Sequence, residues 1–307
     1  MKPNQYTWIF SVALAFLSFS TYAQVESVFN GISFNESIKT VQQKLDAISE
    51  SSKIISIKIP SFPLAKDKEE HLICTNIKTS NGIIAKAAFS FSDDKLSFIE
   101  ARGNAIKSLI ETRKDTAMVY LGFKVYRADM LFADPKTDNV KFLTKEAAHP
   151  NLFMWSNPYL ISNDDTNPEY NASAIIPDFL KMGADMDELK PLIEANSTLT
   201  QTQQLDGSDP NAQVQINAFG VQYAGFPRKI EARFGDNKLN AVWILTGKGE
   251  EDRIRQKLIS AYGEPIFKTE DWEIFNNWQI GLRKDKPEVL LLTQKIGLEY
   301  KKDFFKQ

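Results

Sequence analysis

The sequence predicts an α+β fold made by tandem duplication of a helix-plus-antiparallel-sheet unit. Three short motifs each occur twice, in the same order along the chain. They occupy residues 31–36 and 183–188, residues 91–96 and 234–239, and residues 120–122 and 261–263. A supersecondary unit that recurs constrains the architecture strongly. We therefore predict that the copies superpose, with Gly31 on Gly183, Leu96 on Leu239 and Gly122 on Gly263.

Each copy opens with a predicted helix start. Ser33 is followed three residues later by Glu36, and Asp185 is followed in the same way by Glu188. In such a capping box the first side chain accepts a hydrogen bond from the opening turn, and the carboxylate reaches back to the cap. Pro191 predicts that the second helix is shorter or starts later.

A hairpin and a third strand follow in each copy. The dipeptide Asn81-Gly82 is preferred at a type I′ turn, and the repeated motif that includes Asp93-Asp94 predicts the next tight turn. The predicted strands span residues 72–78, 83–91 and 96–101 in the first copy and residues 213–222, 229–234 and 239–246 in the second.

A second helix is predicted at residues 104–120 and 251–262, because apolar residues recur there at helical spacing and glycines follow. The copies then close with extended segments at residues 125–133, 152–155, 273–278 and 289–293. Each unit is thus an antiparallel sheet with helices on one face.

The two ends and the middle of the chain define the domain organisation. Residues 1–23 resemble a secretory signal, with Lys2 at a positive start, an apolar core and a small-residue cleavage site at Ala23. The apolar core is shorter than the ~20 residues of a membrane span. Residues 163–177 have the composition of a linker. The predicted units are therefore residues 24–162 and 178–307, in a periplasmic or secreted bacterial protein that is not inserted in the membrane after cleavage.

Composition excludes several classes of partner and chemistry. Loss of Lys2 with the signal changes the formal net charge from −2 to −3, and no basic stripe of the kind that binds nucleic acid is present. Cys74 is the single cysteine, so no intramolecular disulfide can form. We interpret Cys74 as a buried small hydrophobe.

The repeated pattern resembles two families of bacterial proteins. A helix opens at Gly-x-Ser/Asp-x-x-Glu, a hairpin turns at Phe-x-Asp-Asn-Lys-Leu, and a helix ends at Tyr262-Gly-Glu-Pro265. In outline this resembles the BamE-like (SmpA/OmlA) envelope lipoproteins and the tandem-repeat β-lactamase inhibitor proteins. The resemblance implies a non-enzymatic protein-binding scaffold. The chain departs from the first family because it has no cysteine at the predicted cleavage site.

No constellation of catalytic or metal-binding residues emerges from the sequence. His71 and His149 are the only histidines. His71 and Cys74 are three residues apart on a predicted strand, so they point to opposite faces. The oxygen-rich loops at residues 163–167 and 206–211 are typical of turns. We predict no catalytic residue, no cofactor site and no metal site.

The remaining signal is a set of apolar runs. Residues 152–155, 242–245 and 289–292 are apolar at consecutive positions, so both faces of these predicted strands must be covered. The cover is either the contact between the repeats or a partner protein. Four aromatic residues are predicted to bind protein. Phe153, Trp155 and Trp243 lie in these runs, and Trp272 lies outside them.

These observations favour a soluble, non-enzymatic module that binds another envelope or secreted protein, as an inhibitor or an immunity-type factor does. Two other classes stay open, which are an envelope hydrolase of unrecognised type and a carrier of small molecules or lipids. A pocket with convergent polar groups would favour the enzyme. A broad exposed aromatic surface without such a pocket would favour the binding protein.

Overall fold

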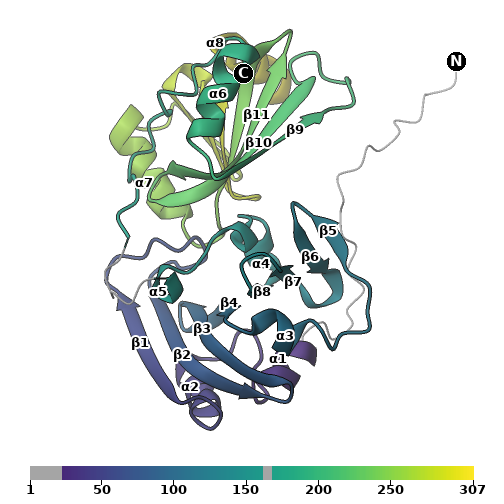
Figure 1. Ribbon diagram of the computed structural model, residues 1–307. Coiled ribbons are helices and arrows are strands. Elements are labelled where there is room, and N and C mark those ends of the chain that lie inside the picture. Colours follow the sequence, from purple (N-terminus) through teal and green to yellow (C-terminus); the bar gives the residue numbers. More distant parts are fainter. Residues whose placement is uncertain (1–22, 162–167) are drawn as a thin grey trace, which may run out of the picture.

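The computed structural model describes residues 23–161 and 168–307 (Figure 1). The predicted signal, apart from Ala23, and part of the predicted linker lie outside the described residues. The described chain forms two eight-stranded antiparallel sheets, one in each half. The protein is therefore α+β with two similar sheet units.

The two sheets have the same strand order when read from β1 and from β9. The first runs β1-β2-β3-β4-β8-β7-β6-β5 and the second runs β9-β10-β11-β12-β16-β15-β14-β13. In that order the first sheet comprises Ser51–Ile57, Glu69–Thr79, Gly82–Ser92, Lys95–Arg102, Asn139–Leu143, Leu131–Asp134, Phe123–Tyr126 and Met118–Tyr120. The second comprises Leu199–Gln204, Val214–Tyr223, Phe226–Gly235, Lys238–Leu245, Glu288–Leu292, Ile280–Arg283, Trp272–Phe275 and Phe267–Lys268.

Helices are short and lie between and around the strands. The α-helices are α1 (Ala23–Val28), α2 (Ile38–Asp46), α3 (Ala105–Leu109), α4 (Lys145–Ala148), α5 (Pro158–Ile161), α6 (Met186–Ala195), α7 (Glu251–Tyr262) and α8 (Gln294–Glu299). Single helical turns occur at η1 (Arg127–Asp129), η2 (Leu152–Met154) and η3 (Asn276–Trp278), and a π-helical turn, η4 (Tyr300–Phe304), continues α8.

The repeated hairpin motif is correctly predicted. Phe91 pairs with Leu96, and Phe234 pairs with Leu239, and a β-bulge precedes the aromatic residue in both halves. Both tight turns hold two residues at positive φ, Asp93-Asp94 and Asp236-Asn237. Aspartate and asparagine tolerate this left-handed conformation, which a type I′ turn requires.

The predicted match of Gly31 with Gly183 is wrong by four residues. Gly183 N–H donates to the Leu239 carbonyl at 2.8 Å, and in the first half Asn35 N–H donates to the Leu96 carbonyl at 2.9 Å. Asn35 therefore occupies the place of Gly183, because it also adopts a positive φ, of 67°. Gly31 instead ends the turn after α1, where its N–H donates to the Glu26 carbonyl at 2.7 Å.

The helix start in the first half shifts in the same way. Ser37 caps α2, and its Oγ accepts from Thr40 N–H at 3.3 Å. Ser33 donates its hydroxyl to Glu26 Oε1 at 2.8 Å instead. Asp185 is the N-cap residue of α6 as predicted, but its carboxylate bonds Lys238 Nζ at 2.9 Å and caps no backbone N–H.

Replacing Ser37 by alanine should lower the free energy of unfolding by about 1 kcal/mol, because the change removes a helix N-cap acceptor. Ser33→Ala is the matched control and should change it by less than about 0.5 kcal/mol. Chemical denaturation of both variants decides this. A larger loss in Ser33→Ala than in Ser37→Ala would contradict the assignment of the cap.

The second predicted helix is correct in one half only. α7 spans Glu251–Tyr262 and ends at Gly263, whereas α3 ends at Leu109. The following segment leaves the helix because Arg113 lies over the Tyr126 ring, 4.2 Å from its centroid, and bonds Asp129. Met118–Tyr120 then pairs as β5 with β6. Gly122 lies in the β5–β6 turn and is not equivalent to Gly263.

The closing segments also differ from the prediction. Residues 152–155 are η2 and the residue after it, not a strand, and the counterpart of β16 is β8. Residues 125–133 and 273–278 each combine strand with a helical turn, while β16 matches its predicted segment. Thr144 and Thr293 follow β8 and β16, and each side chain caps the next helix at 3.3 Å.

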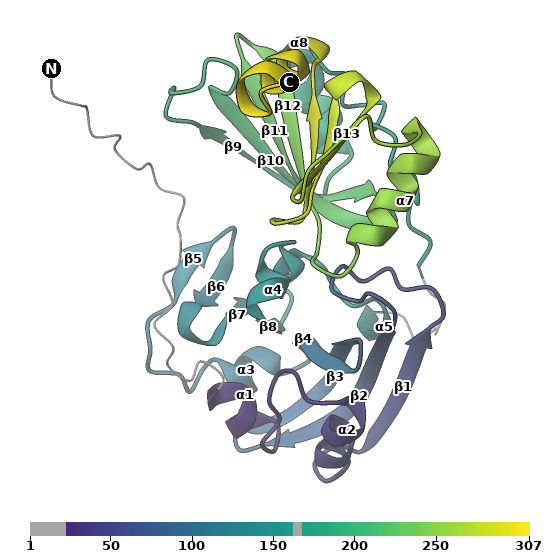
Figure 2. The same cartoon turned by 180° about the vertical axis from the view of Figure 1, so that it is seen from behind.

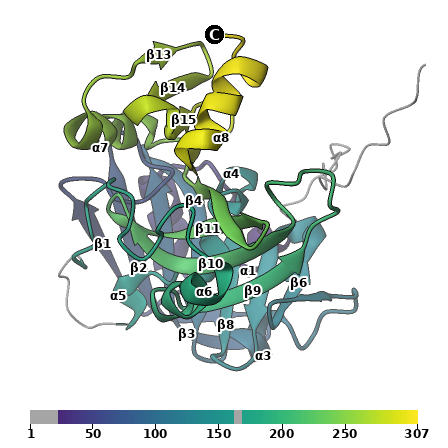
Figure 3. The ribbon, with the colours of Figure 1, turned by 90° about the horizontal axis from the view of Figure 1, so that it is seen from above.

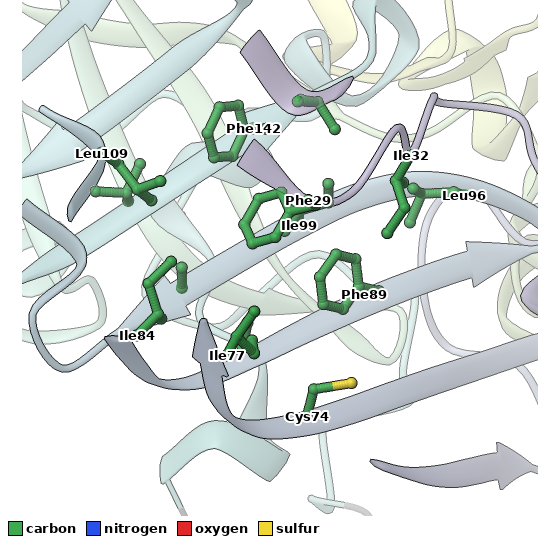
Figure 4. Close-up of a cluster of buried hydrophobic side chains, with 14 of the residues drawn as sticks. Phe29, Ile32, Cys74, Ile77, Ile84, Phe89, Leu96, Ile99, Leu109 and Phe142 are labelled. Carbon is green, nitrogen blue, oxygen red and sulfur yellow. The ribbon is translucent and has the colours of Figure 1, made fainter. Parts of the chain in front are cut away.

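Each half has its own apolar core. In the first half, side chains of α1, α2 and α3 pack on one face of the sheet. Figure 4 shows part of this core, with Phe29, Ile32 and Leu109 beside residues of the strands. Phe29 meets Phe89 edge to face, with ring centroids 5.3 Å apart. Cys74 is fully buried here, as predicted, and burial raises its pKa to about 12. The thiol is therefore a packing group at neutral pH. Side chains of α6 and α7 contribute in the same way to the second core.

Candidate binding groove

The four predicted binding residues lie in two separate places. Phe153 and Trp155 belong to an aromatic cluster that joins the two halves. Trp243 and Trp272 lie in a cluster on the face of the second sheet opposite its main core, together with side chains of α8. The prediction that Trp155 lies in a strand is wrong, since it follows η2.

The joint between the halves is built from aromatic rings. The Trp155 ring centroid lies 5.3 Å from Phe62, 5.5 Å from Phe98 and 5.6 Å from Phe226. Phe226 comes from the second half, so Trp155 bridges the halves, and only 8% of its surface is exposed. Large buried aromatic residues contribute strongly to such contacts.

A loop of the first half, residues 58–68, forms the other part of the joint (Figure 2). We call it the docking loop. A Cβ atom added at Gly247 would lie 2.3 Å from the Pro63 carbonyl oxygen, and one at Gly249 would lie 2.2 Å from that of Leu64. Glycine at both positions therefore lets the two backbones meet. Arg253 of α7 also donates to the Phe62 carbonyl at 3.0 Å.

A buried ion pair supports the joint from the second half. Arg228 and Glu250 are 1% and 2% exposed. The guanidinium donates to both carboxylate oxygens, with Nη2 2.8 Å from Oε2, and its Nε donates to the Tyr223 carbonyl at 3.1 Å. Glu250 also accepts from Gly247 N–H at 2.7 Å, so the pair holds the strand-to-helix loop that receives the docking loop.

A Glu-His-Ser cluster in the first half has the residue types of a catalytic triad. His71 Nε2 lies 2.9 Å from Glu69 Oε1, and His71 Nδ1 lies 2.9 Å from Ser90 Oγ and 3.0 Å from Asn157 Nδ2. Ser90 is 0% exposed and His71 is 1% exposed. A nucleophile without access to solvent cannot attack a substrate, so the cluster is structural.

Glu69 ties this cluster to the docking loop. Its Oε2 accepts from Ser61 N–H at 2.6 Å and from Phe62 N–H at 2.9 Å. Burial alone would raise the pKa of the Glu69 carboxyl. The hydrogen bond and the charge of His71, together with the hydrogen bonds from the two loop N–H groups, outweigh burial and lower this pKa. The carboxylate form therefore holds the loop in place.

This pKa shift predicts a pH dependence of stability. Because the pKa of Glu69 is lowered in the folded state, its contribution to the free energy of unfolding is complete above its ordinary pKa of 4.5. That contribution is lost as the pH falls through the folded-state pKa. Glu69→Gln should therefore flatten the fall in stability on acidification. Denaturation at about pH 7 and below about pH 4 measures this. An equally steep fall in both proteins would contradict it.

The face of the second sheet that carries Trp243 is hollowed beside the C-terminal helical segment. Figure 3 shows α8 beside β14 and β15. A groove of about 550 Å³ opens there, which is within the range of ligand-binding clefts. We call it the aromatic groove, and its lining residues are Asp209, Asn211, Trp243, Trp272, Arg283, Glu299, Tyr300, Asp303 and Phe304.

Aromatic side chains from two strands and the π-helical turn form its walls. Trp243 and Trp272 meet edge to face with centroids 6.3 Å apart, and Phe304 lies 6.0 Å from Trp272. Trp272 lies against Gly281, where a Cβ would come within 3.0 Å of the indole ring. Phe304 is 58% exposed, so the groove presents apolar surface directly to solvent.

Some charged residues of the groove have an ion-pair partner and others have none among the described residues. Arg283 lies over Trp272, 5.6 Å from the ring centroid, and donates to both oxygens of Asp285 at 2.8 Å. Within the described residues, Glu299 and Asp303 have no ion pair. In the part of the chain that the structure describes, the Asp209 carboxylate accepts one hydrogen bond, from Asn211 N–H at 2.8 Å. Burial, and then the charge of Asp209, raises the pKa of Tyr300, so Tyr300 remains a neutral phenol.

A second cavity of about 300 Å³ lies in the joint. Trp155, Tyr170 and Phe219 supply its aromatic lining, and Arg228 and Lys229 are its cations. Both cations are already paired, Arg228 with Glu250 and Lys229 with Glu231 at 2.8 Å. The two cations of this cavity are therefore neutralised by carboxylates of the second half.

Sequence reasoning identified two residues of the aromatic groove and missed the others. Trp243 was found from an apolar run and Trp272 was predicted beside it, but Arg283, Tyr300 and Phe304 were not predicted. The signal that could have found Tyr300 and Phe304 is the C-terminal segment, where they are four residues apart with Asp303 between them. Residues at this spacing share one side of a helix.

Comparisons with known protein families, with curated proteins and with solved structures found no match to this chain. The resemblance to BamE-like proteins and β-lactamase inhibitor proteins stays a prediction. In the described residues no helix is long and apolar enough to span a membrane. Nor do three or more His, Cys, Asp or Glu side chains gather there in a way that could hold a metal ion.

Proposed function

We propose that this chain is a non-enzymatic, extracytoplasmic protein that binds another envelope or secreted protein through the aromatic groove. The observation that carries the proposal is the groove itself, with two tryptophans on a sheet and the exposed Phe304 opposite them. Aromatic residues in a hollow are typical of the energetic centre of a protein interface. The strands beneath them supply a rigid base.

The alternative of an enzyme has weaker support. The Glu69-His71-Ser90 cluster is the best candidate for nucleophilic chemistry among the described residues, and it is sealed from solvent. Among the described residues that line the groove there are carboxylates but no histidine or cysteine. The exposed aromatic rings and carboxylates of the groove therefore fit a protein-binding role better than a catalytic role.

We further propose that the two halves arose by duplication of one helix-plus-sheet unit, with a linker at residues 163–177. Support comes from the shared strand order, from the bulges before Phe91 and Phe234, and from the threonine caps after β8 and β16. These features recur at equivalent places although few residues are identical.

The extracytoplasmic location rests on the signal in residues 1–23. Cleavage after Ala23 would leave every described core residue in the mature chain, since the first of them is Val25. The mature protein should begin at Gln24 and carry no acyl group. Intact-mass measurement of the native protein checks this, and a mass that retains residues 1–23 would contradict it.

Affinity capture with paired variants tests the binding role. The tagged protein, the double variant Trp243→Ala/Phe304→Ala and the control Val119→Ala would be incubated with the extracytoplasmic fraction of the source cells. Val119 is 75% exposed and lies in the first half, so its loss controls for exposed apolar surface. We expect one polypeptide retained by the wild type and the control and lost with the double variant. Equal retention by all three would overturn the proposal.

A further inference from the structure

We infer that the aromatic groove accepts a basic segment of the partner polypeptide, with a lysine or arginine side chain between the tryptophans and the carboxylates. This inference rests on the proposed function and specifies the chemistry of the partner. It follows from which charges in the groove are paired and which are not.

The carboxylates of the groove are open to a partner. Glu299 and Asp303 make no ion pair in the part of the chain that the structure describes, and Asp303 is exposed. One carboxylate oxygen of Asp209 accepts a hydrogen bond from Asn211 N–H. Among the described residues Arg283 is the one cation that lines the groove, and it is already held by Asp285 and lies 3.6 Å from Glu288. The unsatisfied charge in the groove is therefore negative.

The tryptophans favour a cation in the same place. A guanidinium or ammonium group is attracted to the face of an aromatic ring, most strongly to that of tryptophan. The protein already uses this contact, because Arg283 lies over Trp272 and Arg233 lies 5.8 Å from the centroid of Trp243. Arg233 has its own partners, Gln215 and Glu231. The aliphatic stem of a lysine or arginine also packs well on aromatic surface.

The size of the groove favours a polypeptide over a small cation. Its volume of about 550 Å³ exceeds what one ammonium or guanidinium group fills, and it extends from the β9–β10 loop at Asp209 to Phe304. A peptide segment would place a basic side chain against Trp243, which is partly exposed, and beside Trp272, which is 8% exposed, with its neighbours against Phe304. Nucleic acid is disfavoured because phosphates would meet Asp209, Glu299 and Asp303.

Fluorine NMR of protein labelled with 5-fluorotryptophan tests the inference even if binding is weak. The mature chain contains Trp155, Trp243, Trp272 and Trp278, so Trp155 in the joint serves as an internal control. The probes are three acetylated and amidated hexapeptides of Gly and Leu that carry two central lysines, two glutamines or two glutamates. Choline chloride is the fourth probe.

We expect the lysine peptide at millimolar concentration to shift the Trp243 and Trp272 resonances and leave that of Trp155 unchanged. The glutamine and glutamate peptides should have no such effect. Glu299→Lys/Asp303→Lys should weaken binding of the lysine peptide about tenfold, because exposed ion pairs are each worth up to about fivefold. Asp178→Lys/Glu194→Lys makes the same charge change at exposed sites away from the groove and should bind as the wild type does.

Three results would overturn the inference. One is equal binding of all three peptides with no effect of charge reversal, which would leave the groove as a protein-binding site without preference for basic segments. The second is a choline effect as large as that of the lysine peptide, which would indicate a small-cation site. The third is no shift of either tryptophan by any peptide. The capture experiment with Trp243→Ala/Phe304→Ala then decides the proposed function separately.

Discussion

Replacing Trp155 by alanine is expected to lower the free energy of unfolding by about 3–5 kcal/mol. Its ring contacts Phe62 and Phe98 of one half and Phe226 of the other, and it is 8% exposed. The substitution therefore opens a cavity in the joint. The backbone contacts of the docking loop with Gly247 and Gly249 oppose collapse of this cavity. Denaturant unfolding followed by circular dichroism measures the loss.

Phe304→Ala is the matched control for Trp155→Ala, because it removes an aromatic ring that is 58% exposed. This control should change the free energy of unfolding by less than about 1 kcal/mol. A loss in Trp155→Ala no larger than that of the control would show that the halves do not meet through this cluster.

Replacing Glu250 by alanine is expected to cost about 3–5 kcal/mol, because it leaves the buried Arg228 guanidinium without its carboxylate. The substitution also removes the acceptor of Gly247 N–H, so the loop that receives the docking loop loses a second support. Thermal and chemical unfolding both report the change.

Lys238→Gln provides the comparison for Glu250→Ala. It breaks the ion pair with Asp185 at 2.9 Å, in which both side chains are 49% exposed, and exposed pairs contribute less than about 1 kcal/mol. Similar losses in the two variants would mean that Arg228 and Glu250 are hydrated in solution and do not form a buried pair.

The sequence predicted those parts of the fold that depend on local turn chemistry. The hairpin that ends at Leu96 and the one that ends at Leu239 were placed correctly, because two consecutive residues at positive φ need Asp or Asn. Placing these turns also placed the long strands on either side of them. The edge strands β1 and β9 were missed, because β9 is largely polar and the isoleucines of β1, at positions 54, 55 and 57, do not alternate regularly with polar residues.

The errors arose where tertiary contacts decide the conformation. The residues after Leu109 have helical spacing, but Arg113 is drawn to Tyr126 and Asp129 and the chain turns into β5. Gly31 was matched to Gly183 because glycine was taken as the marker of the turn. Asn35 performs that role at a positive φ. The predicted equivalent of Gly183 was therefore placed four residues too early in the first half.

The candidate site could be predicted only in part, for a related reason. Consecutive apolar residues indicated that Trp243 is covered on both faces, but they did not indicate by what. The cover is α8 and the turn that follows it, which bring Tyr300, Asp303 and Phe304 beside Trp243, more than fifty residues earlier in the sequence. Which carboxylates remain unpaired is also a property of the folded chain, because it depends on where Arg283 finds its partners.

The central claim, that the protein binds another protein through the aromatic groove, is tested most directly by site-specific photo-crosslinking. Benzoyl-phenylalanine would be introduced at position 304 in one protein and at position 119 in another, both exposed apolar sites, and irradiated in the extracytoplasmic fraction. The account predicts a discrete adduct with one polypeptide from position 304 and none from position 119, and loss of that adduct when Trp243→Ala is added. Adducts of equal yield from both positions, or an adduct from position 119 alone, would contradict it.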